Sequence, residues 1–188
     1  MPRSYIGLKR QFDALPGPVR RYFKKLEPLL KDGANFDVTL AFLFVKVEEA
    51  HHRALKCGFV RLLDCDSEKV DEVLERQHFT RAAFWSVFRN VFGSEIKPED
   101  KAKLSKAEDT RDKLMHGKRV EAGELRNALG AVFEYVVALG AFVETKTKKN
   151  PFGDLRGLVG RRETLGTTQS FWIMKGCGLM SQVKAGRA

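Results

Sequence analysis

Residues 36–63 read FDVTLAFLFVKVEEAHHRALKCGFVRLL, and this stretch decides the fold. Asp37 can accept hydrogen bonds from the N–H groups of a first helical turn. Apolar residues then recur at alternating steps of three and four, which is the spacing of one face of an α-helix: Val38, Ala41, Val45, Leu55, Phe59 and Leu62. The stretch therefore predicts one long helix, with Glu48 and His52 on the same apolar face.

The chain on either side of this helix also favours helices, whose ends are marked by proline and glycine. Pro18 and Pro98 fall in expected first turns, and Gly93 and Gly117 follow expected last turns. The further expected helices cover residues 15–30, 67–76, 79–92, 98–116 and 122–145.

These helices predict an all-α protein, an antiparallel helical bundle of about five to six helices. Residues 1–35 form an N-terminal helical segment and residues 36–145 the bundle. Residues 146–188 form a basic, glycine-rich C-terminal extension. Within the extension, the apolar run FWIM at residues 171–174 favours a short strand or a docked β-hairpin.

The composition, with 43% hydrophobic and 31% charged residues, is that of a soluble globular protein with one core. The longest apolar stretch, Ala128 to Val143, is interrupted by Glu134 and is short for a membrane span, so no membrane partner is expected. No signal-peptide pattern opens the chain, and the three cysteines form no CxxC pair. We therefore expect a cytoplasmic protein.

The net charge is +10, and the excess lies mostly in residues 146–188, where nine Lys and Arg face only two acidic residues. Such a basic excess indicates a polyanionic partner. Duplex DNA as the partner is supported by the charge alone, because no helix-turn-helix or zinc pattern is present. The glycines of the extension lack the strand-to-helix context of a phosphate-binding loop, so no cofactor is expected.

Arg111 is a candidate functional residue because it falls on the apolar face of its helix, in line with Leu104, Ala107 and Leu114. A permanently charged guanidinium at such a position needs a partner. His116 lies about 140° further round an ideal helix. At the fraying last turn its side chain can turn back, so that the two side chains converge.

A structural role is the alternative for these residues. Arg111 can extend along the rim of the bundle or pair with Glu48, while His116 and Lys113 complement the negative end of the helix dipole. Glu48 and His52 supply only two candidate metal ligands, so no metal is expected, and a buried ion pair is the preferred interpretation.

The segment RDKLMH at residues 111–116 resembles the signature of the HEPN superfamily. That signature is an Arg, a polar residue (Asn, Asp or His), three to five further residues and a His, matched here by Arg111, Asp112 and His116. The resemblance covers residues 36–145. One departure is Lys118, at a position where the HEPN toxins paired with nucleotidyltransferase antitoxins usually have a nucleotide-accepting Tyr.

The resemblance implies an antiparallel helical bundle that forms a two-fold homodimer. Many HEPN proteins are metal-independent ribonucleases of toxin–antitoxin, phage-defence or RNA-processing systems, and others are noncatalytic binding modules. It thus implies RNA as substrate, an antitoxin protein as partner, and a composite cleft in which two copies of Arg111 and His116 meet. The alternative function is a noncatalytic adaptor that binds RNA or protein.

Metal-free RNA cleavage requires a proton to leave the 2′-OH, charge to be stabilised on the phosphate, and the 5′-oxygen to be protonated. The resemblance assigns His116 to acid–base work and Arg111 to the phosphate, with Asp112 and Glu48 in support. Nearby cations would disfavour a charged imidazole and attract RNA. The expected RNA-binding residues are Lys113, Lys118, Arg119, Arg161 and Arg162.

The extension has two compatible interpretations. Its cations, together with Phe171 and Trp172, can follow an RNA backbone and stack a base. Alternatively, the extension is a solvated tail whose FWIM segment docks onto the bundle.

Overall fold

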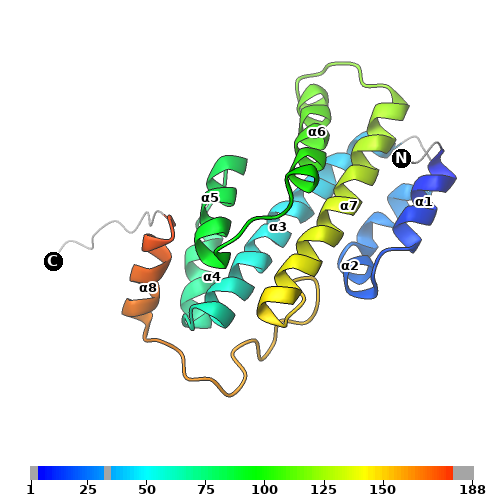
Figure 1. Ribbon diagram of the computed structural model, residues 1–188. Helices are drawn as coiled ribbons and strands as arrows, with labels where there is room; N and C mark the ends of the chain where they lie inside the picture. The colour runs from blue at the N-terminus through cyan, green and yellow to red at the C-terminus, as the bar shows by residue number, and fades with distance from the viewer. Residues whose placement is uncertain (1–3, 32–34, 180–188) are drawn as a thin grey trace. The chain divides into compact units, whose positions relative to one another are not determined.

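The computed structural model describes residues 4–31 and 35–179, and within these ranges every regular element is a helix (Figure 1). The all-α prediction is therefore confirmed. Two 3-10 turns, η1 (Lys24–Leu26) and η2 (Pro28–Leu30), accompany the α-helices. The α-helices are α1 (Tyr5–Asp13), α2 (Gly17–Tyr22), α3 (Phe36–Leu62), α4 (Ser67–Glu75), α5 (Arg81–Phe92), α6 (Pro98–Met115), α7 (Ala122–Thr147) and α8 (Thr167–Gly176).

The chain divides into two compact units that are interleaved in sequence. Unit 1 combines residues 1–50 with residues 96–142, and unit 2 combines residues 51–95 with residues 143–188. The two long helices, α3 and α7, therefore contribute their first parts to unit 1 and their last parts to unit 2.

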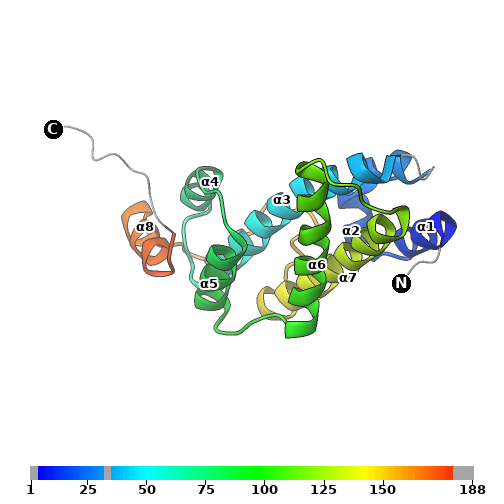
Figure 2. The same cartoon turned by 90° about the horizontal axis from the view of Figure 1, so that it is seen from above.

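Unit 1 is built around the first part of α7. On one side α1 runs along α7 (Figures 1 and 2), where the Phe12 and Phe133 rings lie 5.7 Å apart and the Gln11 side-chain amide donates to the Gly130 carbonyl at 3.1 Å. On another side lies α6, whose Lys103 ammonium contacts a carboxylate oxygen of α7 at 2.9 Å. Aromatic packing and polar bonds thus hold three helices together.

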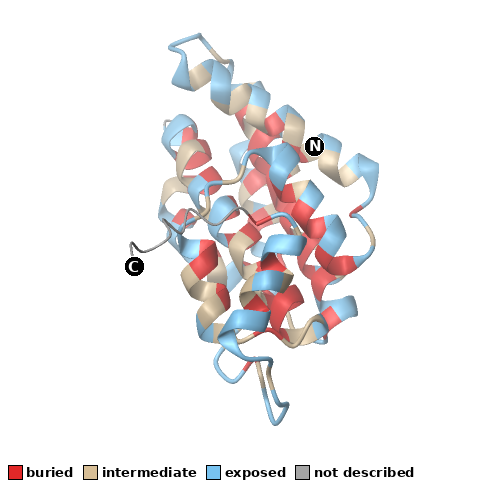
Figure 3. Cartoon of the chain, turned by 90° about the vertical axis from the view of Figure 1, so that its left-hand side faces the viewer, coloured by how far each residue is buried: buried red, intermediate tan, exposed pale blue. Residues whose placement is uncertain are grey.

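The predicted apolar face of α3 is right in unit 2, where Leu55 and Phe59 are fully buried, and wrong in unit 1. Val38 and Val45 are 55% and 60% exposed, and Glu48 is exposed as well. The buried side of the helix in unit 1 carries larger side chains: Phe36, Leu40, Leu43, Phe44 and Val47. Both sets have helical spacing, and burying the larger set removes more apolar area from water. Figure 3 shows how buried and exposed residues alternate along the helices.

Unit 2 brings α3 and α5 into close contact at Gly58. An added Cβ on Gly58 would lie 2.4 Å from Cγ1 of Val91 and 2.9 Å from Cζ of Phe92. Because real Cβ atoms do not approach other atoms so closely, the contact requires glycine. The absent side chain thus sets how near the two helices lie.

The FWIM segment lies in α8, so the prediction of a strand or hairpin there is wrong. Ser170 and Met174 are both buried, and their separation of four residues is a helical spacing. The helix α8 packs on α4, and the Ser170 hydroxyl accepts a hydrogen bond from the Asp66 N–H at 2.8 Å. Residues 148–166, which precede α8, contain no helix or strand.

Two arginines of α3 hold this irregular segment. The Arg53 Nε donates to the Pro151 carbonyl at 2.6 Å, and its Nη2 donates to the Gly153 carbonyl. The Arg61 Nη1 donates to the Leu158 carbonyl at 3.3 Å. Buried carbonyls without secondary structure need such donors, and the arginines supply them.

Proline and glycine marked several helix ends correctly. Helix α6 begins at Pro98, and Gly93 and Gly117 adopt left-handed conformations with φ of 65° and 68° after α5 and α6. The expected helix over residues 15–30 instead ends at Tyr22 and continues as 3-10 turns, and α1 was not predicted. A proline within the expected helix, Pro28, removes a donor and interrupts it.

Within the described residues, α7 alone is long and apolar enough to cross a membrane by length and composition. A core helix of a soluble protein meets the same criterion. Leu129, Val132 and Phe133 of α7 are fully buried in the protein, as expected of a core helix.

Replacing Gly58 by alanine tests the contact between α3 and α5. Overpacking costs about 1–3 kcal/mol, which exceeds the helix propensity gained of up to about 1 kcal/mol. We expect Gly58→Ala to lower the free energy of unfolding, measured with urea. Gly123→Ala is the matched control, because the nearest atom to its added Cβ is 3.8 Å away. A Gly58→Ala protein as stable as the Gly123→Ala protein would contradict the close contact.

Stability should also fall in acid because of His51, which is buried and stacks on Phe84 with ring centroids 3.8 Å apart. Burial, and secondly the neighbouring His52, lower the pKa of His51 from 6.5 to about 3. Below pH 6.5 the His51 imidazole is protonated in the unfolded chain, whereas in the folded protein it stays neutral until the pH approaches 3. Each pH unit down to about pH 3 then removes up to about 1.4 kcal/mol of stability. Urea unfolding of His51→Phe should show a shallower acid slope than wild type, whereas His116→Gln, at an exposed site, should not.

Candidate functional site at the end of α6

The candidate site lies where α6 ends. His116 is the last residue of the helical path, with φ −91° and ψ 14°, and Gly117 follows in the left-handed region. The Lys118 N–H donates to the Lys113 carbonyl, and the Gly117 N–H donates to the Leu114 carbonyl, each at 2.9 Å. These two bonds define a Schellman motif, so the backbone around His116 is fixed rather than frayed.

Arg111 lies one and a half turns before this end and is held on two sides. Its side chain is 29% exposed, and its guanidinium carbon lies 4.7 Å from the centre of the Phe44 ring on α3. Its Nε and Nη2 both donate to Oδ1 of Asp112, at 3.1 and 2.8 Å. The bonds leave Nη1 without a hydrogen-bond partner among the described residues. The guanidinium is thus positioned, with free donors at one end.

The two expected partners of Arg111 differ in outcome. Asp112 contacts it, and the supporting role of Asp112 stays a prediction. Glu48 is exposed on α3, so the prediction of a buried Glu48 ion pair is wrong. The Arg111 guanidinium instead packs on the Phe44 ring, one turn before Glu48 on α3, and its hydrogen bonds go to Asp112. The expectation that Arg111 lies at the rim of the bundle agrees with its partial exposure.

His116 is exposed, and most cations around it have acidic partners. The Lys113 ammonium lies 3.7 Å from a Glu124 oxygen, and the Arg119 Nε lies 3.4 Å from a Glu121 oxygen. Lys118 is exposed and has no such partner within the described part of the chain. The positive field at the end of α6 is therefore weaker than the sequence alone suggests.

The two expected RNA-binding arginines of the extension differ in their surroundings. The Arg162 Nη1 donates to the Arg61 carbonyl at 2.7 Å and contacts Oδ1 of Asp64 at 3.2 Å, so this side chain ties the extension to the end of α3. Arg161 is exposed and available for a ligand. Both belong to unit 2, whereas Arg111 and His116 belong to unit 1.

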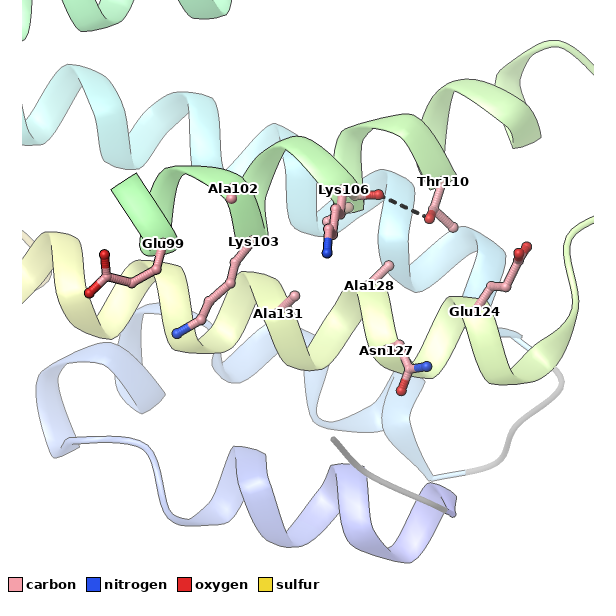
Figure 4. Close-up of a pocket in the computed structure, with 10 residues that line it drawn as sticks. Glu99, Ala102, Lys103, Lys106, Thr110, Glu124, Asn127, Ala128 and Ala131 are labelled. Atoms are coloured by element: carbon pink, nitrogen blue, oxygen red, sulfur yellow. Dashed lines mark hydrogen bonds between the residues drawn. The ribbon is translucent and has the colours of Figure 1, made fainter. Parts of the chain in front are cut away.

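Sequence reasoning missed a groove between α6 and α7 (Figure 4), a cavity of about 420 Å³. Its floor consists of small side chains from both helices: Ala102, Ala107, Ala128 and Ala131. Charged residues line its edges, including Glu99, Lys106 and Glu124. The alanines at steps of three to five on α6 and α7 were the available signal. The lining has neither histidine nor cysteine, and its small apolar side chains suit the binding of a partner.

Further candidate site residues are two cysteine thiols and the possible metal ligands. Burial raises the pKa of the Cys57 thiol to about 12 and that of the Cys65 thiol to about 11, which keeps both protonated and unreactive. Within residues 4–31 and 35–179, no three His, Cys, Asp or Glu side chains are grouped to hold a metal ion.

Comparison of the chain with known protein families, with characterised proteins and with solved structures finds no match.

Stability measurements should separate the structural role of Arg111 from that of His116. Arg111→Ala removes the contact with Phe44 and the ion pair with Asp112, and we expect a loss of about 1 kcal/mol in the free energy of unfolding. His116→Ala, at an exposed site, should change it by less than about 0.5 kcal/mol. Urea titrations of both variants check this, and an Arg111→Ala protein with wild-type stability would contradict the packing of Arg111 on Phe44.

Proposed function

We propose that this protein is a metal-independent endoribonuclease of the HEPN type, acting in the cytoplasm as a homodimer in toxin–antitoxin or phage defence. The observation that carries the proposal is the arrangement of Arg111: its guanidinium is fixed by Phe44 and Asp112, yet Nη1 is free to bind an anion. An exposed imidazole, His116, ends the same helix.

The mechanism follows from the chemistry of these two side chains. Arg111 binds a non-bridging phosphate oxygen and stabilises the charge that accumulates there in the transition state. His116 takes the proton of the 2′-OH, and the freed oxygen attacks phosphorus. The His116 of the second copy donates a proton to the departing 5′-oxygen. The products are a 2′,3′-cyclic phosphate and a 5′-hydroxyl.

The second copy is part of the proposal because one imidazole cannot serve as base and acid on opposite sides of the phosphate in the same step. A two-fold contact at the end of α6 supplies the second pair. Unit 1 has apolar surface for such a contact: Met115, next to His116, is 72% exposed, and Val38 and Val45 of α3 are also exposed.

The proposal predicts cleavage of a labelled mixed-sequence RNA by wild type in excess EDTA. His116→Ala and Arg111→Ala should each lose cleavage by roughly 100-fold or more, since each removes a group that acts in the transition state. His78→Ala, at another exposed histidine, is the matched control and should cut as wild type does. Gel analysis with an end-group assay for the cyclic phosphate measures the outcome.

Undiminished cleavage by both site variants would remove Arg111 and His116 from the mechanism. Absence of cleavage by wild type on mixed-sequence, structured and single-stranded RNA would favour the second candidate function, a noncatalytic adaptor. The groove between α6 and α7 favours that candidate, since an alanine floor with charged edges suits an amphipathic helix of a protein partner.

A further inference from the structure

Helix α8 exposes an aromatic surface that the α6 site does not use. Trp172 is 59% exposed, on the side of α8 opposite the buried Ser170 and Met174. The neighbouring Phe171 ring lies 5.6 Å from the Trp172 ring, at an interplanar angle of 69°. An exposed indole offers a flat apolar face on which a planar ligand can stack.

Two lysines accompany these rings. The Lys175 ammonium lies over the Trp172 ring, 4.9 Å from its centre, and the Lys69 ammonium lies 6.0 Å from the centre of the Phe171 ring. Since Lys175 lies over one face of the indole, the other face is available for stacking. Lys175 has no acidic partner among the described residues, so its charge is available to an anion.

Further features beside the rings fit a phosphate–sugar backbone. A hollow of about 260 Å³ lies against Phe171 and is lined by Lys69, Thr167 and Thr168. Arg161, six residues before α8 begins at Thr167, is exposed. Among the acids of α4, Asp71 pairs with Lys56 and Glu72 pairs with Lys69 and Arg76, whereas Glu68 is exposed. Lys175 and Arg161 therefore supply the positive charge of this surface that has no acidic partner among the described residues.

This combination selects one class of partner. Duplex nucleic acid hides its base faces, whereas a single strand exposes them to aromatic side chains and its phosphates to lysines. A membrane-surface helix would present several large apolar side chains to lipid. In α8, Met174 is buried in the protein, and Trp172 is the only apolar residue of the helix that is largely exposed.

We propose that Phe171, Trp172 and Lys175, which we call the α8 platform, bind single-stranded RNA by stacking a base on Trp172 and pairing Lys175 with a phosphate. The choice of RNA over single-stranded DNA rests on the proposed function. The platform deepens that function, because it gives the enzyme a substrate-binding surface separate from Arg111 and His116.

The test uses the full chain carrying His116→Ala, so that RNA is not cut, and measures the fluorescence anisotropy of a labelled 12-nucleotide oligouridylate in EDTA. Trp172→Ala should weaken binding roughly 10-fold or more, as expected for loss of one stacked base. Trp172→Phe keeps a ring and should bind within about 3-fold of the parent. Tyr5→Ala removes a 45% exposed aromatic residue in unit 1 and is the matched control, expected to bind normally.

The lysine has its own readout, the salt dependence of binding. Lys175→Gln should reduce the slope of log affinity against log salt by about 0.7, the value for one phosphate contact on a single strand. Lys25→Gln, at an exposed lysine of unit 1, should leave that slope unchanged. Circular dichroism confirms that each variant is folded.

The proposal is overturned if Trp172→Ala binds as tightly as its parent, if Trp172→Phe is as weak as Trp172→Ala, or if Tyr5→Ala loses as much. It is also overturned if vesicles containing phosphatidylserine quench Trp172 fluorescence while the oligouridylate does not.

Failure of the platform and failure of the nuclease are separable. If cleavage depends on His116 but binding is unchanged by Trp172→Ala, only the platform is rejected. Trp172-dependent binding by a chain whose wild type cuts no RNA rejects only the nuclease.

Discussion

The buried face of α3 is the constraint on which the rest of the structure depends, because this one helix contributes to both units. In unit 1 the face is wide and filled by large side chains such as Leu40, Leu43 and Phe44. In unit 2 the helix is also deeply buried, at Leu55, Phe59 and Val60, and Val91 and Phe92 of α5 leave no room for a Cβ on Gly58. One helix therefore fills one core with large side chains and in the other combines such side chains with a close helix contact at glycine. A rotation of α3 about its axis would disturb both cores at once, which fixes its register.

The candidate site depends on that register through Phe44. With Phe44 directed toward α6, the apolar position at residue 111 can hold an arginine, because the ring covers the guanidinium and Asp112 accepts two of its hydrogen bonds. A guanidinium stacks on an aromatic face and stays charged, which a lysine would do less well. The structural explanation for Arg111 and the functional one are thus compatible. The packing accounts for the position of the Arg111 side chain, and Nη1 remains as a donor for the anion of the proposed function.

Sequence reasoning found the features that local chemistry decides and missed those that tertiary packing decides. The helical class, the start of α6 at Pro98 and the glycine-terminated ends of α5 and α6 follow from backbone rules that act within one turn. The buried face of α3 in unit 1 does not, because two sets of apolar residues share the helical spacing there and only contacts with neighbouring elements decide which set is buried. Asp112 is the next residue in the chain, so it could be named as a partner of Arg111 from the sequence. Phe44 lies on a different helix, so its contact with Arg111 could not. The FWIM segment was assigned to a strand because a short apolar run carries no period of its own.

The distribution of unpaired charge separates attraction for RNA from chemistry on RNA. At the end of α6, acidic side chains accompany Arg111, Lys113 and Arg119, so the net field there is small. In unit 2, Arg53 and Arg61 of α3 donate hydrogen bonds to backbone carbonyls of the extension. Arg161 and Lys175 add charge without acidic partners among the described residues. Long-range attraction of a polyanion depends on uncompensated charge, whereas proton transfer depends on a positioned and reachable imidazole. Under the proposed function, unit 2 would therefore bind the strand, and the exposed His116 of unit 1 would act on it.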